Sequence, residues 1–141
     1  MAKDTSKILE ELKTFSDFES FIEQNSESLN HSELSECLNE IVKEKGLNKA
    51  KIIERAQLGE VYAYQIFSGI RKNPDRNKLI ALAFGMELDF EQTQNLLKKT
   101  GYAPLYAKNP FDCIIIYALY NGYSIIQANE MLYDYGLETL G

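Results

Sequence analysis

The sequence has few of the residues that enzymes and metal sites need. It contains one histidine, His31, and two cysteines, Cys37 and Cys113, which lie far apart in the chain. These three residues form no metal-ligand spacing, and the glycines mark predicted helix ends instead of forming a phosphate-binding loop. His31 lies in a polar segment, where an exposed side chain is more common than an acid–base group. We therefore expect a protein that is not an enzyme and that holds no metal ion or cofactor.

Long apolar runs are missing as well. A membrane-spanning helix needs about 18 consecutive apolar residues, and the densest run here, residues 113–119, ends before Asn121. The N-terminus carries Asp4, Glu10 and Glu11 where a signal peptide would need an apolar segment. The sequence therefore predicts a cytoplasmic protein that does not enter a membrane, with both cysteines as reduced residues of the core.

Positive charge is scarce overall but is concentrated in one part of the chain. The net charge of −6 argues against a general binder of polyanions. Residues 1–31 have three Lys against seven acidic residues, and residues 102–141 have one Lys against four. Residues 43–78, in contrast, have nine Lys or Arg against four acidic residues. These nine cations would contact phosphates, or they form the solvated surface of ordinary helices.

The composition is that of a globular, all-α protein. With 45% hydrophobic and 26% charged residues, a chain of 141 residues can bury a core without metal or disulfide support. Apolar residues recur at helical spacing from one end of the chain to the other. We expect an acidic N-terminal helical arm, a five-helix domain and a C-terminal helical hairpin that extends the same core. Their bounds are residues 1–31, 32–101 and 102–141.

The centre of the chain predicts a helix-turn-helix. Asn48 can cap a short helix that ends near Ala56. After a turn at residues 57–59, a second helix runs over residues 60–67, and Gly69 ends it because glycine adopts the left-handed cap conformation without a Cβ clash. The second helix has an apolar stripe on one side and an outward row of side chains on the other. Two short helices arranged in this way can place the second helix in the DNA major groove.

The C-terminal part of the chain contains an internal repeat. A shift of 35 residues aligns Asp89 with Ser124, Gly101 with Gly136 and Leu105 with Leu140. Each copy is a helix, a short turn capped by Asp or Ser, and a second helix closed by Gly. The second copy therefore predicts a helical hairpin, with helices at residues 111–120 and 124–135.

Tyrosine is concentrated in the same C-terminal part. Residues 102–141 hold seven of the nine tyrosines. So small a unit cannot bury all of these rings and also satisfy their hydroxyls, so we expect an aromatic surface. Such a surface favours a protein partner or self-association. The alternative is that the rings cover the edge of the core with their hydroxyls in water.

The order of apolar residues, glycine and proline from Leu34 to Gly101 follows a known pattern. The matching positions are Gly46, Leu47, the run from Leu58 to Tyr62, Ile66, Ser68, Gly69, Arg71, Pro74, Leu79, Leu82 and Ala83. With these residues, about half of the chain resembles the Cro/C1-type (Xre-family) helix-turn-helix regulators of bacteria and phages. The resemblance implies a five-helix domain that binds double-stranded operator DNA with its third helix, usually as a homodimer and without a cofactor.

The resemblance also implies which residues contact DNA. Lys49 at the start of the second helix, and Arg71 and Lys72 after the third helix, would contact phosphates. Four residues of the third helix would face the bases: Glu60, Val61, Tyr64 and Gln65. Gln65 would pair with adenine and Glu60 would accept a hydrogen bond from cytosine, while Tyr64 would contact the backbone or a thymine methyl group.

Two hypotheses for the function remain. The first is a sequence-specific transcriptional regulator that reads the major groove with the helix at residues 60–67. The second is a non-enzymatic protein-interaction module on a degenerate helix-turn-helix scaffold, which uses the tyrosine-rich hairpin and the acidic ends. The carboxylate of Glu60 favours the second hypothesis, since phosphates repel it unless it meets a cytosine amine or a neighbouring arginine.

Overall fold

The computed structural model describes residues 33–140, and all of their regular structure is helical. The chain divides into two compact units, residues 1–31 and 32–141, and the described residues belong to the second unit. This unit has seven helices and no strand within the described residues, which confirms the all-α prediction. The helices are α4 (Leu34–Lys45), α5 (Lys49–Ala56), α6 (Glu60–Ser68), α7 (Arg76–Gly85), α8 (Phe90–Lys99), α9 (Pro110–Tyr120) and α10 (Ile125–Asp134). The predicted N-terminal arm lies outside the described residues.

The turn between α5 and α6 follows from local signals. Asn48 begins α5 as predicted, because its side-chain oxygen accepts a hydrogen bond from the backbone N–H of Lys51 at 3.1 Å. The helix ends at Gln57, which adopts the left-handed conformation with a φ of 59°. Gly59 then precedes α6, and Gly69 ends α6 with a φ of 88°. A three-residue turn therefore separates two short helices.

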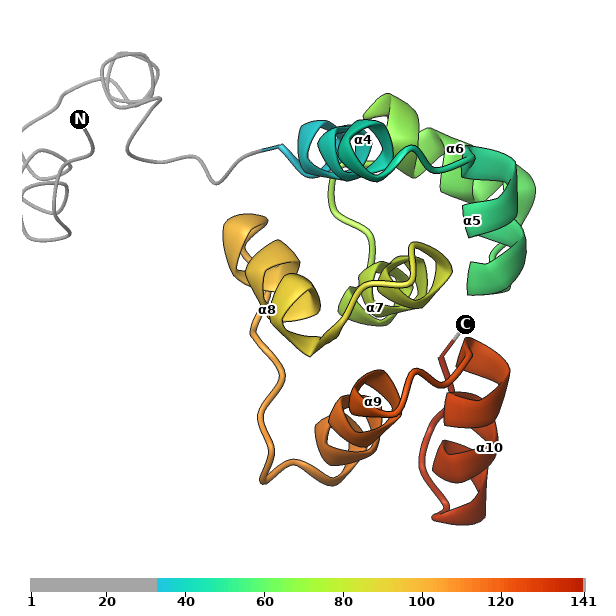
Figure 1. Cartoon of the computed structure of the whole chain (residues 1–141), viewed down its shortest axis with the longest axis vertical. Coiled ribbons are helices and arrows are strands. Elements are labelled where there is room, and N and C mark those ends of the chain that lie inside the picture. Colours follow the sequence, from blue (N-terminus) through green and yellow to red (C-terminus); the bar gives the residue numbers. More distant parts are fainter. Residues whose placement is uncertain (1–32, 141) are drawn as a thin grey trace, which may run out of the picture. The chain divides into compact units, whose positions relative to one another are not determined.

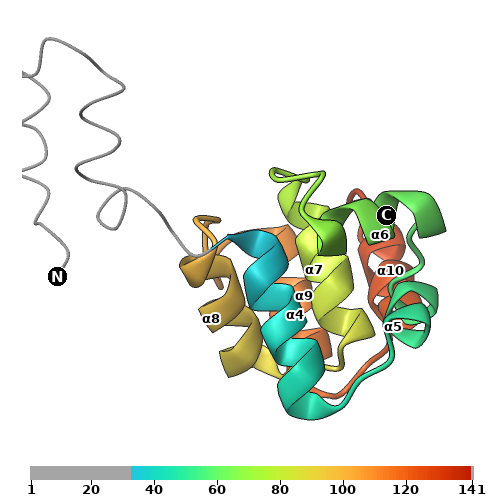
Figure 2. The same cartoon turned by 90° about the horizontal axis from the view of Figure 1, so that it is seen from above.

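Helix α7 forms the centre of the core. Its residues from Leu79 to Gly85 are all buried, and Figures 1 and 2 both show α7 in the middle of the unit, with other helices around it. Gly85 lets α5 come close: a Cβ at this position would lie 2.4 Å from the backbone oxygen of Ile52 and 3.1 Å from the Cβ of Ala56. The absence of a side chain at residue 85 therefore allows α5 to cross α7 with their backbones in contact.

The two copies of the internal repeat have the same local structure. Asp89 and Gln92 form a reciprocal capping box at the start of α8, and Ser124 and Gln127 form the equivalent box at the start of α10. The segment after each hairpin is also held alike. The side-chain amide of Gln94 exchanges two hydrogen bonds with the backbone of Leu105, and that of Asn129 exchanges two with Leu140. The pairs α7–α8 and α9–α10 are therefore two copies of one supersecondary unit.

An ion pair between a partly exposed arginine and a buried aspartate joins the two copies. The guanidinium of Arg76, at the start of α7, donates two hydrogen bonds of 2.9 Å to the carboxylate of Asp112, in the first turn of α9. The backbone N–H of Tyr106 donates to the same carboxylate, and the Nε of Arg76 donates to the carbonyl of Ala103. Because Asp112 is buried, these bonds replace the water that its charge would otherwise need.

The two cysteines differ in their exposure. Cys37 is buried on α4, but Cys113 is exposed on α9, so its predicted place in the core is wrong. The reason is that α9 is apolar on every side, and its sequence does not tell which side packs inward. None of the described helices is long and apolar enough to cross a membrane.

Candidate nucleic-acid interface

Helix α6 carries an outward row of side chains that no described segment covers. Ala63 and Ile66 face the core and are completely buried. On the opposite side, Glu60 and Tyr64 are exposed, and Val61 is 73% exposed. We call these three residues together with Gln65, which is half-buried, the α6 row. The structure thus places all four residues predicted to face DNA bases on one side of one helix.

The position of α6 is held at its C-terminal end by α4. The side-chain amide of Asn39 donates hydrogen bonds to the backbone carbonyls of Phe67, at 2.9 Å, and of Ser35, at 2.8 Å. The first bond satisfies a carbonyl that the end of α6 would otherwise leave without a partner. The α6 row is therefore presented by a helix that is fixed to the core, which suits a surface that must match a partner.

Gln65 and Arg71 form a coupled pair at the edge of the row. The Nε of Arg71 donates to the side-chain oxygen of Gln65 at 2.8 Å, and its backbone N–H donates to the carbonyl of the same residue. The guanidinium also lies 4.5 Å above the ring of Tyr62, as in a cation–π contact. Arg71 therefore lies beside the α6 row, with the two terminal nitrogens of its guanidinium directed away from the bond to Gln65.

Tyr62 is a site residue that the sequence does not predict. Helical spacing predicts Tyr62 on the inward stripe together with Ala63 and Ile66. It is only half-buried, and the Nζ of Lys78 lies 5.9 Å from the centre of its ring. The ring of Tyr62 thus lies close to two cations, Arg71 and Lys78. Helical spacing could not reveal this role, because both cations come from segments that follow α6.

Lys49 and Lys72, the other two residues predicted to contact phosphates, differ in their surroundings. Lys49, at the start of α5, is half-buried, and its Nζ lies 5.3 Å from the ring centre of Phe67 at the end of α6. Lys72 is exposed in the segment after α6. The structure therefore brings Lys49 and Arg71 against residues of α6, whereas Lys72 stands in solvent nearby in the chain.

Two of the nine cations counted in residues 43–78 are held by carboxylates. Arg76 binds the buried Asp112, and Arg55 forms an ion pair of 2.9 Å with Glu87. Their charge is therefore already compensated, and the positive surface near α6 is smaller than the sequence suggests. Glu60 forms no ion pair with any described residue, so its carboxylate is available to a hydrogen-bond donor of a partner.

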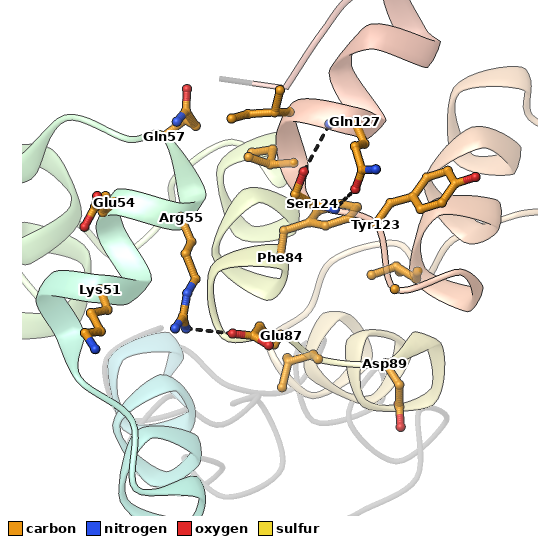
Figure 3. Close-up of a pocket in the computed structure, with 15 residues that line it drawn as sticks. Lys51, Glu54, Arg55, Gln57, Phe84, Glu87, Asp89, Tyr123, Ser124 and Gln127 are labelled. Atoms are coloured by element: carbon orange, nitrogen blue, oxygen red, sulfur yellow. Dashed lines mark hydrogen bonds and ion pairs between the residues drawn. The ribbon is translucent and has the colours of Figure 1, made fainter.

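A groove separates α5 from the turns of the two repeats (Figure 3). Its volume is about 810 Å³, which lies in the range of small-molecule sites. Figure 3 shows Arg55 reaching to Glu87, and Ser124 and Gln127 bonded to each other. Because these polar groups bind one another, we assign no ligand to the groove. Within residues 33–140, no cluster of three or more His, Cys, Asp or Glu side chains could hold a metal ion.

A scan against known protein families and searches of curated proteins and of solved structures find no match to the chain. The resemblance to Cro/C1-type regulators therefore rests on the residues of this sequence.

Proposed function

We propose that the protein is a sequence-specific DNA-binding transcriptional regulator that inserts α6 into the major groove. The observation that carries this proposal is the α6 row, an uncovered set of side chains on a helix that the core holds in place. An α-helix fits the width of the major groove, and side chains in such a row can reach the edges of the bases.

The cations around α6 support the proposal. Lys49 lies against the end of the helix, Arg71 lies against its flank, and Lys72 follows it in the chain. Phosphates line both edges of the major groove, so cations on either side of an inserted helix can bind the DNA backbone. Three such contacts would give a slope of about −3 in a plot of the logarithm of the binding constant against that of salt concentration.

The Gln65–Arg71 pair suggests how the helix reads sequence. The side-chain nitrogen of Gln65 can donate to a base, while its oxygen already accepts from Arg71. Arg71 keeps its two terminal nitrogens for a guanine or a phosphate. We therefore expect the two residues to act together, with Gln65→Ala changing sequence preference and also loosening the position of Arg71.

Binding of labelled genomic fragments at two salt concentrations tests the proposal. Lys72→Ala should weaken binding to all retained sequences alike and reduce the salt slope by about 1. Gln65→Ala should change the order of preferred sequences. Lys108→Ala is the matched control, since it removes an exposed lysine before α9 and should change neither quantity. If no fragment is retained at low salt, or if affinity does not depend on salt, the proposal is wrong.

A second function, binding of a protein partner through the same surface, is favoured by two observations. Val61 and Ile70 are large, apolar and exposed on α6 and just after it, and Glu60 has no ion-pair partner among the described residues. Such a surface suits an apolar partner with hydrogen-bond donors. This function predicts a protein that binds the wild-type chain but not Val61→Asp, together with no effect of Lys72→Ala.

A further inference from the structure

The loop between α6 and α7, residues 69–75, carries Arg71 and Lys72, and both side chains are exposed. Arg71 is held by its own contacts with Gln65 and with the ring of Tyr62. Lys72 makes no hydrogen bond or ion pair with any described residue. The position of Lys72 therefore depends on how the backbone of the loop is held.

One hydrogen bond fixes the backbone that follows Lys72. The hydroxyl of Tyr102 donates to the carbonyl oxygen of Pro74 at 2.6 Å, and Pro74 itself is buried. Residues 72–74 make no other hydrogen bond with a described residue. Without the hydroxyl of Tyr102, this stretch would be held only by its two ends and by the packing of the proline ring.

Tyr102 lies just beyond the stretch of chain that resembles Cro/C1-type regulators, which ends at Gly101. The segment that contains Tyr102 is itself fixed. Its backbone N–H donates to the carbonyl of Leu97 at 2.8 Å, and the backbone of Leu105 exchanges two hydrogen bonds with the side chain of Gln94. A donor with a fixed position can hold the loop, whereas a mobile donor would move with it.

The same segment also holds the end of the loop. Arg76 is the first residue of α7, and its guanidinium donates to the carbonyls of Ala103, at 2.9 Å, and of Pro104, at 3.2 Å. Together with the bond from Tyr102, three hydrogen bonds therefore connect the end of the loop with the segment after α8.

We propose that Tyr102 is a positioning residue for the loop between α6 and α7, which it holds so that Lys72 can contact a DNA phosphate. This inference rests on the proposed function. A loop that is ordered before binding loses less conformational entropy when it meets DNA. The segment after α8 thus contributes to DNA affinity without touching DNA.

Tyr102→Phe tests the inference, because it removes the hydroxyl and keeps the ring. In the binding of labelled genomic fragments by the full chain, this variant should bind all retained sequences about 3–10-fold more weakly, with their order of preference unchanged. Tyr106→Phe is the matched control. Tyr106 lies in the same segment, is 60% exposed, and its hydroxyl makes no hydrogen bond with a described residue. This change should alter affinity less than about 2-fold.

A double-mutant cycle shows whether Tyr102 acts through Lys72. In a chain that already carries Lys72→Ala, Tyr102→Phe should weaken binding less than about 2-fold further, because the contact that it positions is gone. A general loss of stability would instead weaken binding by the same factor with and without Lys72. Equal factors in the two backgrounds, or wild-type affinity of Tyr102→Phe, would overturn the inference.

Limited digestion by trypsin examines the loop in the absence of DNA. Cleavage after Lys72 should be at least about 3-fold faster in Tyr102→Phe than in the wild type, while cleavage after Lys98, an exposed residue of α8, should stay unchanged. An unchanged rate after Lys72, or an equal increase at both sites, would contradict the inference. If the wild type retains no DNA fragment, the proposed function fails, but faster cleavage confined to Lys72 would still support the hold of Tyr102 on the loop.

Discussion

Replacing Gly85 by alanine tests the close crossing of α5 and α7, because two physical effects of this change have opposite signs. Alanine favours a helix over glycine by about 1 kcal/mol. Its Cβ, however, would lie 2.4 Å from the backbone oxygen of Ile52, and real Cβ atoms do not approach closer than 3.0 Å. The two helices must therefore separate by roughly 0.6 Å, and overpacking of this kind costs about 3 kcal/mol when backbone must move. The net expectation is a loss of about 2 kcal/mol.

Urea denaturation followed by circular dichroism measures this loss, which corresponds to a decrease in Tm of roughly 5–10 °C. Gly59→Ala is the matched control. A Cβ at Gly59 has only the Cβ of Tyr62 within 4.0 Å, and the position before α6 needs no positive φ, so the change should cost less than about 1 kcal/mol. If Gly85→Ala is as stable as the wild type or more so, α5 does not cross α7 at this distance and the argument from sterics fails.

Three further predictions concern single contacts. Asp112→Ala removes the carboxylate partner of Arg76, whose side chain is 25% exposed and still donates to the carbonyls of Ala103 and Pro104, so the change should cost about 1–3 kcal/mol in urea denaturation. A loss below about 0.5 kcal/mol would contradict a stabilising role of this ion pair. Asn129→Ala removes two hydrogen bonds to the backbone of Leu140 and should cost about 1–2 kcal/mol, with faster amide exchange confined to the C-terminal segment. Unchanged exchange would show that these two hydrogen bonds do not hold the segment. Tyr102 is partly buried, and this burial, followed by the electrostatic effect of Tyr62 and Asp75, raises its pKa above the ordinary 10.0. The folded state thus favours the protonated ring, which stabilises the protein below pH 10.0 and is lost as pH rises through the higher pKa. Tyr102→Phe should remove this part of the alkaline loss of stability, and an identical pH profile would refute the assignment.

Local signals explain what could be predicted from the sequence. The caps at Asn48, Asp89 and Ser124 involve hydrogen bonds to residues three positions away, so a short stretch of sequence contains both partners. The α6 row could be predicted for the same reason, since helical spacing alone separates it from Ala63 and Ile66. Each of these features depends on the order of residues within one or two helical turns.

Contacts between distant segments could not be predicted. Arg76 and Asp112 are 36 residues apart, and nothing near Arg76 distinguishes it from a surface cation. The contact of Arg71 with Tyr62 needs the loop after α6 to fold back, which depends on the conformation of that loop. The exposure of Cys113 could not be predicted either, because α9 has no polar side that marks the surface. These cases share one cause. The spacing of residues within a helix does not tell which distant segments contact that helix.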